Sequence, residues 1–302
     1  VSTRVGDFFN SSQNDGLNCI LTQSPDEVAG EAAPVQVTTI PHECAADNLP
    51  YQVITLEDRY DLYSGDWASG VTSLHWSLKK ADHPKLTAIN GCGISPKDNI
   101  AYCIANISAK PFLARVDKNG VAIVAKTPDD EGAWSASFDE AGVFWANRDA
   151  TIWKFEGAHE LAGWSEPPAD LPVMTVVGNT GKQHGSDNVV WRGHLISVLL
   201  SEVIVTNLSS ANLDTWLAKP SSETLTGSFA SAYMYSGIIY FGGRLYGVFK
   251  LELDLQARTY VSTRVGDFFN SSQNDGLNCI LTQSPDEVAG EAAPVQVTTI
   301  PH

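Results

Sequence analysis

Five cysteines are the residues of this sequence whose chemistry is easiest to anticipate. Cys92 and Cys103 lie on either side of a turn at residues 96–99, and both fall in apolar, strand-like runs. A hairpin around that turn would place the two thiols side by side, so we predict a disulfide between them. The alternative is a pair of buried thiols, since the sequence has no CxxC or HxxxH spacing of the kind that binds zinc.

A second group of residues would be reactive if the fold brought them together. His184 and Asp187 are close in sequence, and with Asn90 they could line a central channel, as in hydrolases that gather such side chains there. The acidic stretches 58–61 and 129–131 and the lone Asp275 lack the spaced D-x-D-x-D-G pattern of a calcium loop, and we expect them to lie in solvated loops. The sequence also lacks a nucleophile elbow, a P-loop and a dinucleotide-binding fingerprint. We therefore predict no catalytic site, no metal and no cofactor.

Several residues indicate carbohydrate, either attached or bound. Trp67, Trp134 and Trp164 fall in loop-like stretches, where an indole can stack on a sugar ring. The other tryptophans fall in strand-like runs, where core packing is expected. Asn-x-Ser/Thr signals, which accept N-linked glycans in a eukaryotic secretory route, occur at Asn10, Asn106, Asn207 and Asn270.

The elements that would position these residues are organised by an internal repeat. Val1–His42 and Val261–His302 are identical, letter for letter. Such an identity indicates either a natural tandem array or an engineered duplication. Val1 corresponds to Val261, which lies in the middle of the strand-like run Ala257–Thr263, and a designed duplication would not normally start there. We therefore predict a tandem array of near-identical units of about 260 residues.

Composition indicates a folded, acidic protein. Hydrophobic residues make up 43% of the chain and charged residues 18%, which does not suggest disorder. The 19 basic residues are outnumbered by 35 acidic ones, so the basic surface that nucleic-acid binding needs is excluded. No uninterrupted run of about 18 apolar residues occurs, and we expect no membrane insertion.

Glycine and proline divide the chain into many short strand-like segments. The clearest group, Leu86–Thr127, has four such segments joined by tight turns, which is the content of one β-propeller blade. Similar groups begin at Ser135, Asn188 and Phe229. The stretch from Tyr51 supplies up to three more strands. These patterns predict an all-β fold, a β-propeller with five blades, although six blades remain possible.

The repeat also predicts how the chain divides. Residues 1–22 are expected to end a preceding unit, residues 23–50 to form an inter-unit linker, and residues 51–281 to form the propeller. The segment DGLNCIL near residue 281 would complete the first blade, and residues 282–302 would start the next linker. Within that linker Val295–Ile300 is strongly β-prone and could add an edge strand to a neighbouring unit.

Counting cysteines by unit changes their interpretation. Cys19 and Cys279 are copies of one position, so each unit has an even number of cysteines, which favours two disulfides and an oxidising compartment. Cys44 has two candidate partners. A bond to Cys279 would lock the ring closed, whereas a bond to Cys19 would cross the linker and bond successive units to one another.

The motifs resemble an uncharacterised propeller-type domain family that occurs in secreted and cell-surface proteins. The resemblance rests on Asn90–Gly93, on the turn Pro96–Asn99 with Tyr102 in the next strand, and on Asn274–Cys279 near the end. Gly91 replaces the alanine of the family pattern, and the stretch Val189–Lys219 fits poorly. The resemblance implies a β-propeller and an extracellular location, and it supplies no catalytic residues.

Together these features predict a non-enzymatic extracellular structural repeat in a fibre, a flagellar hair or a surface adhesin. Its expected partners are neighbouring copies of the same unit, and glycans are possible ligands; nucleic acid is not expected. The alternatives from other classes are a calcium-dependent propeller hydrolase or lactonase, and a glycan-binding propeller. A metal in the central channel would favour the hydrolase, and an exposed tryptophan beside carboxylates would favour the glycan binder.

Overall fold

A computed structural model shows an all-β protein with twenty strands and one short 3-10 helix (Ala158–Glu160) among the described residues. All the described residues belong to one compact unit that begins at Pro34. None of the helices in this part of the chain is long and apolar enough to cross a membrane. The structure describes residues 34–44, 49–67, 71–221, 225, 227, 229–243, 246–267 and 274–282.

Two sheets are simple antiparallel meanders. The first runs in the order β4-β5-β6-β7, and the second runs in the order β8-β9-β10-β11. In each of them the strand that comes first in sequence lies at one edge and the last at the other. The bounds are β4 (Leu86–Ile94), β5 (Ala101–Ile107), β6 (Lys110–Asp117), β7 (Gly120–Lys126), β8 (Ser135–Phe138), β9 (Phe144–Arg148), β10 (Thr151–Phe155) and β11 (Thr175–Asn179).

A third sheet has eight strands and is nearly closed, because the strands at its two edges, β12 and β16, contact each other. It consists of two antiparallel meanders, β12 to β15 and β16 to β19, joined by a short parallel contact between β15 and β19 at Lys219 and Pro220. The bounds are β12 (Asn188–Trp191), β13 (His194–Leu199), β14 (Glu202–Asn207), β15 (Thr215–Pro220), β16 (Ser231–Tyr235), β17 (Ile238–Gly243), β18 (Gly247–Asp254) and β19 (Thr259–Gly266).

The last sheet joins the two ends of the unit. Its order is β20-β1-β2-β3, so β20 (Asn274–Leu277) pairs antiparallel with β1 (Tyr51–Thr55), far away in sequence. The other two strands are β2 (Arg59–Gly65) and β3 (Thr72–Lys79). The region after Tyr51 supplies only three strands of this sheet, β1, β2 and β3. The fourth strand, β20, comes mostly from the segment DGLNCIL (residues 275–281).

Tight turns with positive φ set the register of several strand pairs. Arg192 and Gly193, between β12 and β13, have φ values of 49° and 74°, and Ser236 and Gly237, between β16 and β17, have 45° and 85°. Two consecutive residues with positive φ are typical of the type I′ turn, whose twist matches that of a β-hairpin. The turns read from the sequence therefore fix which residues of each strand point into the core.

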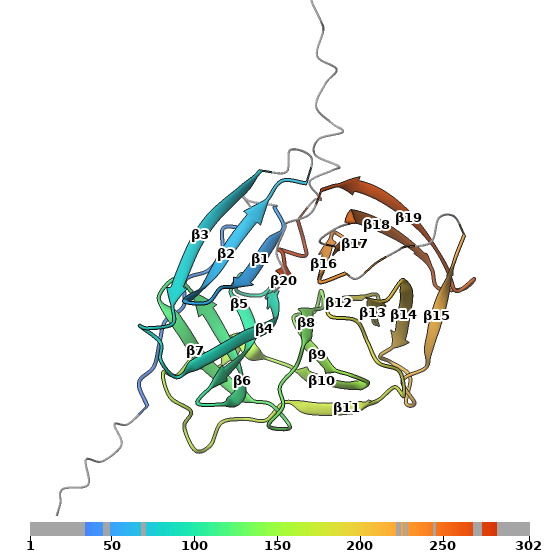
Figure 1. Cartoon of the computed structure of the whole chain (residues 1–302). Helices are drawn as coiled ribbons and strands as arrows, with labels where there is room; N and C mark the ends of the chain where they lie inside the picture. The colour runs from blue at the N-terminus through green and yellow to red at the C-terminus, as the bar shows by residue number, and fades with distance from the viewer. Residues whose placement is uncertain are drawn as a thin grey trace, which may run out of the picture. The chain divides into compact units, whose positions relative to one another are not determined.

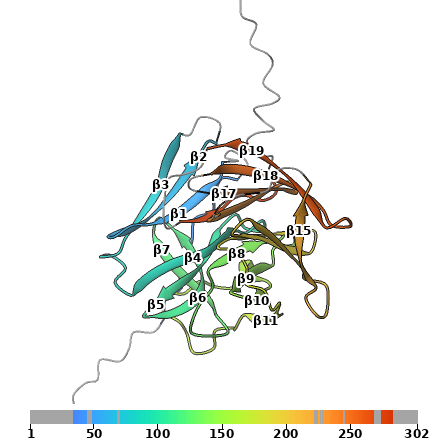
Figure 2. The same ribbon diagram turned by 45° about the vertical axis from the view of Figure 1, so that its right-hand side comes forward.

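In each meander a strand at one edge lies innermost: it is the first of the four in sequence, except in the sheet that joins the two ends of the unit, where it is β20. Strands β4, β8, β12, β16 and β20 contact one another in a closed cycle, each touching the next and β20 touching β4. Figure 1 shows these strands towards the centre of the unit, with β3, β11 and β15 further out, and Figure 2 shows β4 and β8 between β3 and β15 from a second direction. The innermost strand β8 and its counterpart one step out in another sheet, β5, are almost entirely buried, whereas the outer strands β3 and β11 are largely exposed. Strands covered on both faces have continuous apolar sequences.

The segment that leads into β1 packs against the unit. The backbone N–H of Val37 donates to the carbonyl of Gly163 at 2.8 Å, and the N–H of Ile40 donates to the carboxylate of Asp117 at 2.7 Å. We call Pro34–Cys44 the leading segment.

The linker predicted at residues 23–50 is therefore partly structured, since the leading segment packs on the unit. The second copy of the repeated sequence supplies most of β19, from Val261 on, and the whole of β20, while the first copy supplies the leading segment up to His42. The unit takes its beginning from one copy and its end from the other. Residues 1–22 and 295–300, for which a preceding unit and an edge strand are predicted, lie outside the described residues.

Candidate functional site

Buried polar side chains gather where the innermost strands meet. Each of these polar side chains is at most 2% exposed, and each is buried among strands that are otherwise mostly apolar. They come from β1, β8, β16, β20 and the residue before β12. We call this group the central polar cluster; its members are Gln52, Ser135, Asp187, Ser231 and Asp275.

Asp187 connects three inner strands through its carboxylate. One oxygen, Oδ2, accepts hydrogen bonds from the N–H groups of Ala232 in β16, at 2.8 Å, and Gly276 in β20, at 3.1 Å. The other, Oδ1, accepts a 2.9 Å bond from the N–H of Asn188, which begins β12. The innermost strands are edge strands of their sheets, so some of their N–H groups have no partner within the sheet. The Asp187 carboxylate accepts hydrogen bonds from three such N–H groups.

Asp275 makes the equivalent connection from β20 to β4. Its Oδ2 accepts a hydrogen bond from the N–H of Cys92, and the N–H of Gly91 faces the same carboxylate. A register shift between Asn90 and Cys92, with φ of 57° at Gly91, turns both N–H groups in that direction. A β-bulge of this kind redirects backbone groups, and glycine adopts its positive φ without strain.

The two carboxyl groups are buried together, and burial is the main influence on both. It raises the pKa of Asp187 well above its usual range, against the backbone N–H bonds that favour the charged form. Burial raises the pKa of Asp275 as well, and the neighbouring charge of Asp187 raises it further. Two like charges in so dry a site cannot both persist without a proton or a cation to compensate them.

Neutral oxygen atoms complete the cluster. The Nε2 atom of Gln52 donates to the hydroxyl of Ser231 at 2.8 Å, while Ser135 faces the carboxylate of Asp187. Neither Gln52 Oε1 nor Asp275 Oδ1 has a hydrogen-bond partner within the described residues, although both atoms are buried. Buried acceptors without partners are uncommon in folded proteins and call for an explanation.

Apolar side chains fill the space beside the cluster. A void of only about 10 Å³ is lined by residues of all five inner strands, among them Ile94, Phe138, Val189 and Met234. That volume holds one water molecule at most. Among the described residues, the five innermost strands are therefore closely packed around this void.

His184 and Asp187 are both buried, but no hydrogen bond joins them among the described residues. The ring nitrogens of His184 lie 3.1 Å from the hydroxyl of Ser197 and 3.3 Å from that of Thr180. Burial lowers the pKa of His184 to about 4, so the ring is neutral at physiological pH. Asn90, on β4, is only half-buried and lies outside the central polar cluster.

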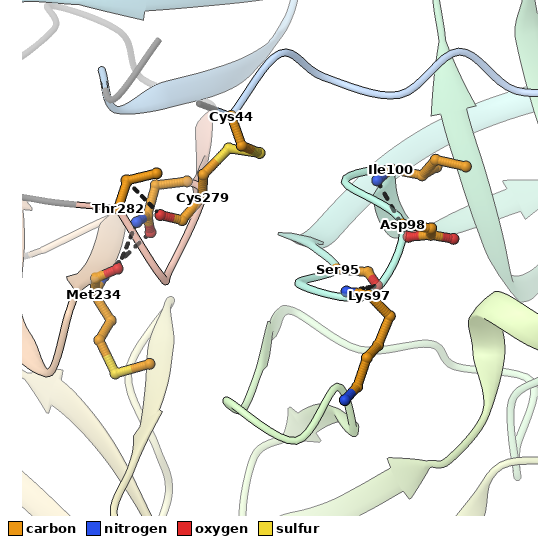
Figure 3. Close-up of a disulfide and its surroundings, with 9 residues drawn as sticks. Cys44, Ser95, Lys97, Asp98, Ile100, Met234, Cys279 and Thr282 are labelled. Atoms are coloured by element: carbon orange, nitrogen blue, oxygen red, sulfur yellow. Dashed lines mark hydrogen bonds between the residues drawn. A yellow bond between two sulfur atoms is a disulfide. The ribbon is translucent and has the colours of Figure 1, made fainter. Parts of the chain in front are cut away.

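Two disulfides brace the unit. Cys92 is bonded to Cys103 between β4 and β5, where the two residues are register partners. Cys44 is bonded to Cys279, so the leading segment is connected to the residues after β20 (Figure 3). Of the two partners considered for Cys44, the structure selects the one that closes the ring; Cys19 lies outside the described residues.

The predicted carbohydrate sites are differently placed. Trp67 is 3% exposed and packs among tyrosines, so the prediction of an accessible loop position is wrong for this residue, because its aromatic neighbours cover it. Trp164 is half-buried beneath the leading segment, and Trp134 is 41% exposed with Arg148 5.0 Å from its ring centre.

The glycosylation signals and acidic stretches lie in strand ends and turns. Asn106 and Asn207 are half-buried near the ends of β5 and β14, and Asn10 and Asn270 lie outside the described residues. In the stretch 58–61, Arg59 forms ion pairs with both Asp58 and Asp61. In the stretch 129–131, the N–H of Glu131 donates to the side chain of Asp129. No group of three or more His, Cys, Asp or Glu side chains in the described part of the chain is placed to hold a metal.

Four members of the central polar cluster are not among the residues predicted to form a site. These residues are Gln52, Ser135, Ser231 and Asp275. Their common signal in the sequence is a polar residue in a short strand of mostly apolar residues. That signal identifies the positions but not their neighbours, because the contacts join strands from opposite ends of the chain.

The chain matches no family model and no curated protein. Among solved structures, it is similar to a protein of unknown function from Bacteroides caccae, with 12% identity over 72% of this chain and 74% of that chain and a TM-score of 0.43. It is also similar to a functionally unknown protein from Desulfotomaculum acetoxidans, with 8% identity over 74% and 68% of the two chains and a TM-score of 0.39. At these TM-scores neither similarity carries an argument about function.

Proposed function

We propose that the unit is a five-bladed β-propeller. The closed cycle of β4, β8, β12, β16 and β20 supports this, because each of these strands is the innermost of four. The eight-stranded sheet then counts as two blades that touch through the short parallel contact of β15 with β19. Pairing of β20 with β1 closes the ring, as the last piece of chain does in many propellers.

The unit is proposed to be one member of a tandem array. The observation that carries this proposal is how the unit uses the repeated sequence. Its beginning, the leading segment, comes from the end of the first copy, and its last strands, β19 and β20, come from the start of the second. One copy therefore contains the end of one unit followed by the beginning of the next, which is the content of a junction between units.

The array is proposed to be an extracellular structural element, such as a fibre, a flagellar hair or an adhesin. The two disulfides are compatible with an oxidising compartment. The packed centre of the unit favours this role over that of a propeller hydrolase, in which substrate enters from the central channel. The partners of each unit are then its neighbours in the chain.

An antibody raised against this chain tests the array in the organism that makes it. Its proteins are separated on denaturing gels with and without reductant and probed with the antibody. A ladder, or a very large species, that persists under reduction supports the array. A single species near 32.5 kDa in both lanes refutes it. Collapse to one small band only after reduction also refutes it, because disulfides and not peptide bonds would then join the units.

A further inference from the structure

Asp275 is buried on the strand that closes the ring. The prediction of a solvated loop is wrong for this residue, because β20 carries it between the other innermost strands, where it is 2% exposed. None of the ten ion pairs among the described residues includes Asp275 or Asp187. A buried carboxylate without a cation is very costly in a folded protein, and a proton removes that cost.

The two buried carboxyl groups receive different numbers of hydrogen-bond donors. Asp187 accepts from three backbone N–H groups, and the hydroxyl of Ser135 also faces it. Asp275 accepts at Oδ2 from the N–H of Cys92, with the N–H of Gly91 facing the same group. Its other oxygen, Oδ1, is buried without a partner among the described residues. Donors stabilise the charged form of a carboxyl group, so this count favours ionised Asp187 and neutral Asp275.

The surroundings of Asp275 supply no positive charge. Among the described residues, the titratable side chains that face it are Asp187, before β12, and Tyr233, on β16. Burial raises the pKa of Tyr233, so its phenol stays neutral. On β4, Cys92 is in a disulfide and does not titrate, and the register partner of Asp275 on β1 is the apolar Val53. An ionised Asp275 would therefore meet only the negative charge of Asp187.

We propose that Asp275 holds a proton on Oδ1 while the ring is closed, and that loss of this proton as the pH rises loosens β20 from the ring. The neutral acid keeps its N–H contacts at Oδ2 and places no charge on the oxygen that lacks a donor. On ionisation the O–H bond breaks, its electron pair stays on Oδ1 and the proton passes to water. This inference does not depend on the array, because all its residues lie within one unit.

The direction of the pH dependence follows from the number of protons that each state binds. Burial and the charge of Asp187 raise the pKa of Asp275 in the folded protein, whereas the unfolded carboxyl group ionises near its usual pKa of about 4. Above about pH 5 the folded state therefore binds one proton more than the unfolded state. This group then raises the unfolding equilibrium constant about tenfold per pH unit, until the folded protein releases the proton.

Urea unfolding of the whole chain and of Asp275→Asn tests the proposal. Asparagine has the same shape, accepts the same N–H groups through its carbonyl and cannot ionise. Between about pH 5 and pH 7 the unaltered chain should weaken about a hundredfold relative to this variant, measured as the ratio of the two unfolding equilibrium constants. His184 is present in both proteins, so its titration cancels in the ratio.

Two control variants locate the proton. Asp117→Asn, which changes another buried carboxylate with two backbone N–H bonds, should follow the pH dependence of the unaltered chain. If Asp187→Asn rather than Asp275→Asn removed the pH dependence, the proton would lie on Asp187 and the proposal would be overturned.

Infrared spectroscopy gives a second readout that does not require any variant to fold. The folded, unaltered chain should show the absorption of a protonated carboxyl group at pH 7, where exposed Asp and Glu side chains are ionised, and urea should abolish it. Absence of that absorption would overturn the proposal. Equal pH dependence of the unaltered chain and Asp275→Asn would overturn it as well.

Discussion

Removing the Cys44–Cys279 disulfide should destabilise the unit more than removing the Cys92–Cys103 disulfide. The first bond spans a sequence separation of 235 and holds the closing strand β20 to the leading segment, while the second spans a separation of 11 within one hairpin. A disulfide limits the conformations of the unfolded chain, and this effect grows with the logarithm of the loop length. The chain-entropy relation gives about 5.5 kcal/mol for the long loop and about 2.8 kcal/mol for the short one.

Double alanine variants measure the difference without leaving a free thiol. One variant is Cys44→Ala/Cys279→Ala and the other is Cys92→Ala/Cys103→Ala. Each variant truncates two buried side chains, so the cost of the lost packing is similar in the two. Urea unfolding, followed by tryptophan fluorescence without reductant, gives the free energy of unfolding of each. We expect the first variant to lose about 3 kcal/mol more than the second.

Hydrogen exchange locates the effect. In Cys44→Ala/Cys279→Ala the amides shared by β20 and β1 should exchange faster, because the end of β20 is released. Full reduction of the unaltered protein should lower its stability by about the sum of the two double variants' losses. An equal or larger loss from the short-loop variant would refute the reasoning that closure of the ring by Cys279 dominates the contribution of the disulfides.

Three further substitutions address buried features. The pKa of His184 is lowered to about 4 in the folded state, below its unfolded value near 6.5. The free energy of unfolding should therefore fall by about 3 kcal/mol as the pH drops from 7 to 4. The same pH series on His184→Gln should lack this part of the loss, so the difference between the two proteins isolates it. Arg115→Met should cost about 3 kcal/mol in urea unfolding, because the buried guanidinium donates to the carbonyls of Ala158 and Leu161, whereas a lysine replacement should recover part of it. Gly185→Ala should lower the melting temperature markedly, since a methyl group there would overlap the backbone of Val198; unchanged melting would show that the backbone moves aside.

Much of the architecture can be read from local sequence, because strands and turns depend on neighbouring residues. The hairpin β4–β5, the turn at Arg192 and Gly193, and the absence of long helices all follow from apolar runs and turn chemistry. The repeat of Val1–His42 at Val261–His302 is visible only in the sequence, and it explains why both ends of one unit occur in the repeated segment.

The tertiary structure decided what distant residues do to one another. Both Cys19 and Cys279 were acceptable partners for Cys44, and only the pairing of β20 with β1 places Cys279 beside it. Likewise the sequence singles out Asp187 beside His184 but does not show that it lies near Asp275. Asp187 and Asp275 become a buried carboxyl pair because closing the ring brings strands from different parts of the chain to one dry centre, where charge must be compensated.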